Sequence, residues 1–401
     1  MDHTGIVLTE PDPLEGCDLS LVHGGPFFRL RTALRLTPEG GLGALWIRVL
    51  ALVSVAWLPV ALGAVLTGRA WSGAEEPLLR HFGVHARCLI AIPLLVLGER
   101  VADRVLPELL RYFVSSGVVG AKALPSYRGV LREFTALRDS PWGLALVLGM
   151  MLLTVAGGFL VEKRNEEVSW AIEHVAGEQR LGFAGAWYVF VSRPLFTGLG
   201  VLWFWRLIVV TRLMRRIAGL ELRLVAAHPD RAAGLSFLDP LLSLFIPGAL
   251  AASIVVASRF GHEVLYHDFH VASLRPVIVL WLTLVLLLFT QPLVPFAQRL
   301  MRMRRESRLR YGAFLGRHGE LLEERWLTGR REDEGLLGAG EIGTAADAFA
   351  LYEAVDRLRP FPLGVRSLLP LAAVALLPFL PVVAIEIPLQ ELLLQIVSAL
   401  A

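Results

Sequence analysis

Seven apolar runs, most of them close to the width of a bilayer, restrict how this chain can fold more than any other feature. They cover about residues 45–67, 84–98, 142–161, 184–210, 240–258, 276–296 and 367–384. A helix needs about 20 consecutive apolar residues to cross the hydrocarbon layer. Inside lipid a helix can satisfy all of its backbone hydrogen bonds within its own segment. The sequence therefore predicts an all-α, polytopic transmembrane bundle of about seven spans.

Composition favours the same class of protein. Of 401 residues, 55% are hydrophobic and only 19% are charged, whereas soluble domains carry about 25% charged residues. The net charge of +3 is too small to indicate a nucleic-acid partner. The first 40 residues contain no apolar stretch followed by a small-residue cleavage site, so we expect the spans themselves to direct insertion into the bilayer.

Arginine and lysine fall mainly in alternate connections between the runs. If the amino terminus is cytosolic, the connections on that side carry 28 Lys and Arg residues, against 8 on the other side. The densest group, Arg299 to Arg310, directly follows the sixth run. Because positive residues accumulate in cytosolic loops, we predict that the amino terminus lies inside and the carboxyl terminus outside.

These runs and connections divide the chain into four parts. In the amino-terminal arm, Phe27, Leu30 and Leu34 share one face of a helix that begins near Pro26, and arginines occupy the other faces. This pattern is typical of an interfacial helix on anionic lipid headgroups. A second amphipathic segment covers 127–137, and the polar loop over 166–180 is expected to be helical at its centre. The parts are an arm (1–44), a six-span core (45–296), a cytosolic Arg-rich helical segment (297–366), and a last span with an outer tail (367–401).

Ionisable residues within the runs are candidates for an ion path. A charge at the centre of a bilayer is costly, so such residues face a cavity or a partner, or reach the interface. Arg193 stands out because it precedes the helix-breaking Pro194. The remaining candidates are Arg206, Glu99 and Arg100, for which the interface is the alternative.

A polar turn from His228 to Leu238 separates the fourth and fifth runs. It contains His228, Asp230 and Arg231, followed by Gly234. Asp230 is expected to cap the start of the fifth span, and Gly234 to permit a tight bend. The alternative is a functional role at the cytosolic mouth of a pore or site.

Histidines gather in the connections predicted to lie outside. His262, His267 and His270 form the densest set, with carboxylates nearby. Imidazole and carboxylate ligands suit zinc or copper. The alternative is a solvated loop whose histidines lie at the interface, since the segment contains neither HExxH nor CxxC.

Several short motifs resemble those of an uncharacterised family of bacterial multi-pass inner-membrane proteins. The resemblance covers nearly the whole chain, although the family has Gly-Gly-Leu where this chain has Ala233-Gly234-Leu235. It implies a bacterial inner-membrane location and no particular activity. The motifs are Gly24 to Leu30 (GGPFFRL), Leu137 to Ser140 (LRDS), His228 to Arg231 (HPDR), Gly338 to Asp347 (GxxEIxTxAD), Arg359 to Pro362 (RPFP) and Glu386 to Leu389 (EIPL).

Three classes of function fit these features. The first is a channel or transporter for a small ion or solute, expected to be a homo-oligomer, in which an Arg-lined inner face would favour anions. The second is a non-catalytic signalling or interaction protein with 297–366 as its docking segment. The third is a metal-dependent membrane enzyme that uses the outer histidines. For all three the bilayer and its anionic lipids are the expected partners.

Overall fold

The computed structural model describes residues 13–33, 42–72, 76–161, 166–175, 178–267, 269–324 and 340–386. Seven helical segments among them are long and apolar enough to cross a membrane. They are Gly43–Leu66, Phe82–Ser115, Leu124–Gly158, Phe183–Ala218, Ser236–Tyr266, Val271–Leu321 and Val365–Val383. Each contains one of the seven apolar runs, so the predicted all-α polytopic bundle is confirmed.

The segments are built from helices joined by short 3₁₀ and π turns. The helices are α1 (Gly25–Ala33), α2 (Leu42–Leu66), α3 (Phe82–His85), α4 (Ile92–Ser115), α5 (Leu124–Arg138), α6 (Pro141–Val161), α7 (Phe183–Trp187), α8 (Arg193–Ala218), α9 (Ile246–Tyr266), α10 (Arg275–Thr290), α11 (Val294–Leu322), α12 (Gly340–Asp356), α13 (Val365–Leu376) and α14 (Leu380–Val383). The 3₁₀ turns are η1 (Leu78–Arg80), η3 (Glu166–Ala171), η5 (Ser236–Phe245), η6 (Val271–Leu274), η7 (Gln291–Leu293) and η9 (Leu377–Phe379). The π turns are η2 (Ala86–Ala91) and η4 (Tyr188–Ser192).

A small β-hairpin replaces the helix expected at the centre of 166–180. Strands β1 (Ile172–Val175) and β2 (Glu178–Leu181) pair antiparallel, with Ile172 opposite Leu181. Only the preceding turn η3 is helical. The expectation was therefore wrong over residues 172–175 and 178–180, and Gly177 in the sequence weakens any continuous helix.

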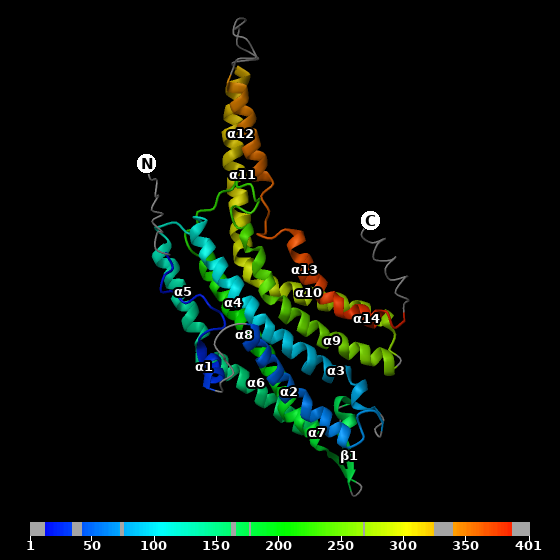
Figure 1. Cartoon of the computed structure of the whole chain (residues 1–401). Coiled ribbons are helices and arrows are strands. Elements are labelled where there is room, and N and C mark those ends of the chain that lie inside the picture. Colours follow the sequence, from blue (N-terminus) through cyan, green and yellow to red (C-terminus); the bar gives the residue numbers. More distant parts are fainter. Residues whose placement is uncertain are drawn as a thin grey trace, which may run out of the picture.

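The two ends of the bundle differ in character. At one end α11 continues beyond the other helices and pairs with α12, forming a projection that we call the stalk (Figure 1). Arg308 in α11 contacts the carboxylate of Asp356 in α12 at 2.8 Å, and Arg304 donates to the carbonyl of Asp356. The β-hairpin lies at the opposite end, which we call the hairpin end (Figure 1). The Arg-rich helix predicted after the sixth run is thus part of α11, which begins at Val294 and extends into the stalk.

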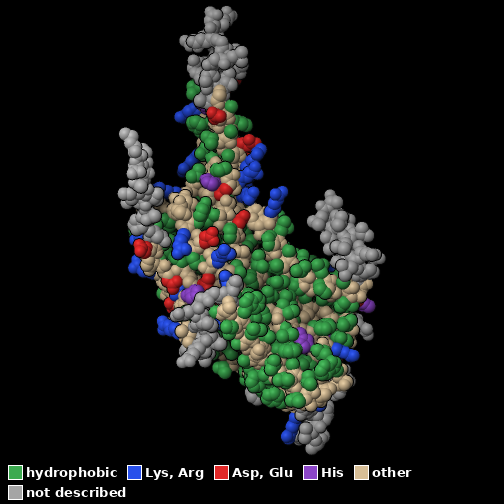
Figure 2. All heavy atoms as spheres, in the orientation of Figure 1, with side chains coloured by type: hydrophobic (Ala, Val, Ile, Leu, Met, Phe, Trp, Pro, Cys, Tyr) green, Lys and Arg blue, Asp and Glu red, His purple; other side chains and the backbone are tan. Residues whose placement is uncertain are grey.

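The outer surface of the bundle is apolar over a broad area. Leu152 in α6, and Leu280 and Leu287 in α10, each leave more than 65% of their surface exposed. Figure 2 shows hydrophobic side chains over much of the visible face of the bundle, and basic side chains, which are all arginines there, along the stalk. Soluble proteins rarely expose contiguous apolar patches of more than a few hundred Å². The surface therefore fits contact with lipid.

In α2, tryptophan and serine side chains of neighbouring elements donate hydrogen bonds to carbonyls close to a proline. Pro59 in α2 has no N–H for the carbonyl of Val55 one turn earlier. The indole of Trp187 donates to that carbonyl at 2.9 Å, and Ser192 donates to the carbonyl of Ala56. Since an unsatisfied carbonyl is expensive in lipid, these bonds hold α2 against α7 and η4.

The amphipathic helix α5 packs on the protein rather than projecting away from it. Tyr127, Leu131 and Phe134 along one face are at most 3% exposed and belong to the main hydrophobic core. The Tyr127 hydroxyl donates to the carbonyl of Leu110 in α4. The apolar stripe predicted over 127–137 thus fixes α5 against the bundle, and α5 runs directly into α6.

Candidate functional site

Two arginines flank one carboxylate inside the bundle. Arg48 of α2 and Arg206 of α8 approach the two oxygens of Glu99 in α4, at 2.5 Å and 2.8 Å. Side-chain exposure is 7% for both Glu99 and Arg206, and 15% for Arg48. This group, which we call the charge triad, joins three spans and carries a net charge of +1. Such buried charges are tolerated only when they are paired and hydrogen-bonded.

Aromatic packing holds Arg206 in place. Its guanidinium lies 5.0 Å from the ring centroid of Trp203, and the Trp203 indole donates to the carbonyl of Leu95 in α4 at 2.8 Å. Gly98 permits this approach, since a Cβ there would lie 2.7 Å from the Trp203 ring. A cation over a desolvated indole is stabilised by the ring quadrupole. The glycine, the tryptophan and the charge triad therefore form one packed unit.

A small cavity lies next to the charge triad, between α1, α6 and α8. Its volume is about 30 Å³, enough for one or two water-sized occupants. Two buried N–H groups in its lining, Arg206 Nη1 and Trp205 Nε1, have no hydrogen-bond partner among the described residues. Buried polar groups are nearly always paired, so these two donors beside the cavity are the groups that a ligand there would satisfy. We call it the Arg206 cavity.

The first turn of α1 closes the Arg206 cavity on one side. Gly24 and Gly25 have φ values of 105° and 76°, which only glycine adopts easily. A Cβ at Gly24 would lie 2.2 Å from the Arg138 guanidinium. Arg138 is itself paired with Asp18 and Asp139, at 2.8 Å and 2.6 Å. The GGPFFRL and LRDS motifs, more than 100 residues apart in sequence, thus pack against each other at this cavity.

The polar turn between α8 and η5 is organised around Asp230. Its carboxylate accepts the backbone N–H groups of Ala232, Gly234 and Ser236 at 2.8–3.1 Å. Ser236 is the first residue of η5, so Asp230 accepts an N–H at the start of the fifth span, although the N-cap residue itself is Leu235, which makes no side-chain cap bond. Burial alone would raise the pKa of Asp230, but these three N–H donors, together with His228, hold it below its usual value.

Two residues of this turn lie in the left-handed region in addition to Gly234. Arg231 has φ 57° and Ala233 has φ 56°. Ala233 occupies the position where the resembling family has its first glycine. The carbonyl of Arg231 accepts the backbone N–H of Arg359, at the start of the RPFP motif. The turn is therefore held to the segment that follows the stalk, and its observed contacts are structural.

The remaining ion-path candidates lie apart from the charge triad. Arg193 is the first residue of α8 and is partly exposed. No hydrogen bond or ion pair joins it to another described residue, and it does not line the Arg206 cavity. Arg100, the residue after Glu99 in α4, is exposed. The structure brings together Arg206 and Glu99, and adds Arg48, Trp205 and the first turn of α1. Charges of opposite sign within spans one, two and four were the only sequence signal for this group.

A larger open cavity lies at the stalk end. It has a volume of about 850 Å³ and lies between the end of α8, residues 224–226 and α11. Arg299, Arg302 and Arg310 line it, with Glu306 as the acidic residue among its lining side chains. Arg299 also donates to the carbonyls of Ala218 and Leu220 at the end of α8. This stalk-end cavity therefore has a predominantly positive wall.

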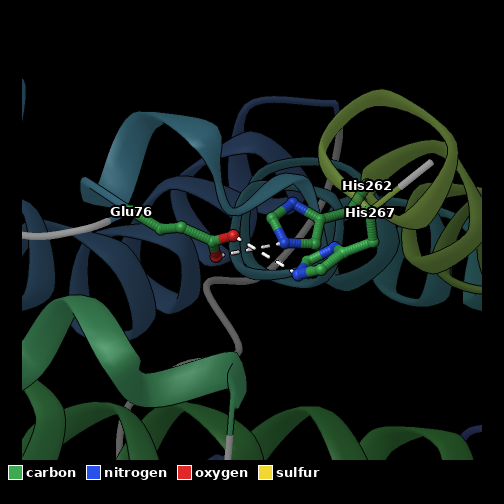
Figure 3. Close-up of side chains that lie close together, drawn as sticks. All are labelled: Glu76, His262 and His267. Atoms are coloured by element: carbon green, nitrogen blue, oxygen red, sulfur yellow. Dashed lines mark ion pairs between the residues drawn. The ribbon is translucent and has the colours of Figure 1, made fainter.

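Histidines and a glutamate meet at the hairpin end. Figure 3 shows Glu76, His262 and His267 with their ligand atoms turned toward one another, all within 4.8 Å. Two of the three predicted histidines are thus brought together, whereas His270 is 83% exposed and lies beside Glu386. Glu76 was missed because it lies about 190 residues earlier, in a short connection with no distinguishing pattern.

Comparison with known proteins identifies no relative of this chain. No protein-family model matches, and neither the curated proteins nor the solved structures contain a significant match.

Proposed function

We propose that this integral membrane protein moves a small monovalent anion across the bilayer, and that the Arg206 cavity is a binding site on its route. The observation that carries the proposal is the pair of buried, unpartnered N–H groups, Arg206 Nη1 and Trp205 Nε1, at one cavity. Both groups can only donate. Their natural ligand is a species that accepts hydrogen bonds, and the positive charge of Arg206 favours an anion.

The surrounding charges support this choice. Arg138 pairs with two carboxylates, Asp18 and Asp139, so its group carries a net charge of −1, while the charge triad, with two arginines against Glu99, carries +1. The Arg138 group is thus the negative side of the cavity, and the charge triad is its positive side. A chloride-sized ion fits a volume of about 30 Å³, and pairing it there reduces the cost of the buried charge.

The stalk-end cavity provides a second supporting feature. A vestibule with a positive wall raises the local concentration of anions before they enter a narrow passage. Arg299, Arg302 and Arg310 supply that wall. We place this vestibule in the cytosol of a bacterial cell, because the connections at this end are those with the excess of Arg and Lys.

Sidedness can be tested with the exposed Val225 beside the vestibule. In a variant without Cys17 and Cys88, Val225→Cys should react with a membrane-impermeant maleimide only after the cells are opened. Labelling in intact cells would place the stalk end outside and reverse the proposed orientation.

The transport proposal is tested in liposomes that contain a halide-quenched dye. Wild-type protein should admit chloride or iodide, and Trp205→Phe should slow this flux by about tenfold, since one charge-assisted hydrogen bond is worth about 1.5–3 kcal/mol. Trp142→Phe is the matched control, because Trp142 is 74% exposed on the neighbouring helix α6. The proposal fails if wild type passes none of chloride, iodide, nitrate or phosphate, or if the two variants behave alike.

The stalk supports a second candidate, a docking role for 297–366. The stalk projects beyond the bundle (Figure 1), and a protein partner or anionic lipid could bind its exposed arginines there. The full-length protein in nanodiscs should then capture a soluble partner, or prefer anionic lipid, through Arg305 and Arg310. Unchanged binding after both are replaced by glutamine would exclude this role.

A further inference from the structure

The cluster at the hairpin end has the spacing of a metal site. We propose that Glu76, His262 and His267 bind a single Zn²⁺ ion. The nearer oxygen of Glu76 lies 3.3 Å from His262 Nε2, and its other oxygen lies 3.6 Å from His267 Nε2. With zinc–ligand bonds of about 2.0–2.2 Å, neighbouring ligand atoms of a tetrahedral site are about 3.3–3.6 Å apart. The two observed separations, each to one of the Glu76 oxygens, fall in this range, and one ligand atom from each of the three residues lies within 4.8 Å of the other two.

The second ring nitrogens of the two histidines face oxygen atoms. His262 Nδ1 lies 3.1 Å from the carbonyl oxygen of Arg80. A carbonyl cannot donate, so this Nδ1 holds the proton and Nε2 is turned toward Glu76. His267 Nδ1 lies 3.6 Å from a carboxylate oxygen of Glu263. Ligating histidines usually donate their other N–H to a carbonyl or carboxylate, as His262 does here, while His267 is within ion-pair distance of Glu263 but beyond hydrogen-bond distance.

The elements that carry the three ligands are held together independently of any metal. His262 lies near the end of α9 and His267 is the C-cap of that helix, while Glu76 precedes Pro77, the N-cap of the turn η1. The His262 ring stacks on the buried ring of His81 at 5.2 Å. Arg80 in η1 lies over the Tyr266 ring of α9. The site is therefore largely preformed between two segments almost 190 residues apart in the sequence.

A small pocket beside His262 could hold the fourth ligand of such a site. A pocket of about 20 Å³ adjoins His262 and is lined by His81, Arg87 and Arg259. It has room for one water-sized ligand. His81 Nε2, 3.5 Å from Glu76, is close enough to orient such a ligand. Three protein ligands with one open position are typical of zinc sites that bind an exchangeable water.

The site is tested by metal binding to purified full-length protein, first stripped with a chelator. We expect one equivalent of Co²⁺ to give the visible absorption of a tetrahedral complex, and Zn²⁺ to displace it. His267→Gln should weaken Zn²⁺ binding by more than 100-fold. Glu263→Gln, which removes only the partner of a ligand, should weaken it by about 10–100-fold.

His270→Gln is the matched control, since His270 lies three residues beyond His267 and outside the cluster. It should bind Zn²⁺ like wild type. The proposal is overturned if wild type takes up no more metal than His267→Gln, which would leave a cluster of ion pairs only, or if His270→Gln loses as much affinity. Thermal unfolding of each variant without metal shows whether it still folds. Because metal binding is measured independently of ion flux, the zinc proposal can fail or succeed separately from the transport proposal.

Discussion

Replacing Glu99 with glutamine should be among the most damaging single changes in the bundle. The substitution keeps the size of the side chain but leaves Arg48 and Arg206 side by side without a counter-charge. Two unit charges about 4 Å apart attract by about 4 kcal/mol at an effective dielectric of 20, and Glu99 makes two such contacts. Part of this lost attraction is offset, because the variant no longer has to desolvate a carboxylate. Removing one member of a buried ion pair costs about 3–5 kcal/mol, which is the loss we expect.

The same reasoning predicts an order among the variants. Arg48→Met leaves Glu99 and Arg206 as a neutral pair, so it should cost about 1.5–3 kcal/mol, as for one charged hydrogen bond. The double variant Glu99→Gln with Arg206→Met removes both members of the more deeply buried pair. Only the partly exposed Arg48 is then left. The double variant should be at least about 1 kcal/mol more stable than Glu99→Gln alone, because a buried uncompensated charge is the main cost of the single change.

The assay is equilibrium unfolding in mixed micelles as the fraction of denaturing detergent is raised. The matched control is Glu133→Gln. Glu133 pairs with Arg216 at 2.6 Å, but both side chains are more than half exposed, and exposed pairs contribute little. No measurable change is therefore expected. If Glu99→Gln unfolds like this control, or if the double variant is less stable than Glu99→Gln, the charge triad does not stabilise the bundle as argued.

Three further predictions concern the turn and the helix packing. Because the pKa of Asp230 is lowered, its contribution to stability is present above its ordinary value of 3.8 and is lost as pH falls through the folded-state value. Asp230→Asn should therefore cost about 2 kcal/mol at pH 7. In pH-dependent melts, the difference from wild type should disappear as the pH falls below the folded-state value. Gly98→Ala should cost about 1–3 kcal/mol, because the new methyl lies 2.7 Å from the Trp203 ring; Gly149→Ala, with open space around it, should be neutral or stabilising, and equal melting temperatures would contradict the packing argument. Trp187→Phe should cost about 1–3 kcal/mol by orphaning the α2 carbonyl that a proline leaves free, and an unchanged unfolding curve would show that this carbonyl finds another partner.

The transmembrane architecture could be predicted from the sequence. Each of the seven apolar runs lies within a helical segment of spanning length, and the Arg-rich helix after the sixth run is α11. The role of Asp230 at the start of the fifth span was also predictable, because its partners are two to six residues away. These features depend on local properties: a run of apolar side chains, or a side chain that reaches its own turn.

The second span shows that a helical stripe in the sequence can predict a helix that continues beyond its apolar run. Its apolar run ends near residue 98, yet the helix continues to Ser115. The continuation is amphipathic, with Leu106, Leu110 and Phe113 fully buried in the main core. Hydropathy marks where lipid contact ends, whereas the helix ends where its protein contacts end.

The two candidate sites depended on the tertiary structure. The Arg206 cavity combines the first turn of α1 with side chains from α8, and Arg48 joins the charge triad from α2. The histidine cluster draws Glu76 from a connection remote in sequence and excludes His270, which is closer along the chain. A sequence shows that a buried charge or an imidazole needs a partner, because desolvation is costly wherever it occurs. Which partner it finds depends on how the helices cross, and that is decided by contacts between side chains far apart in the chain.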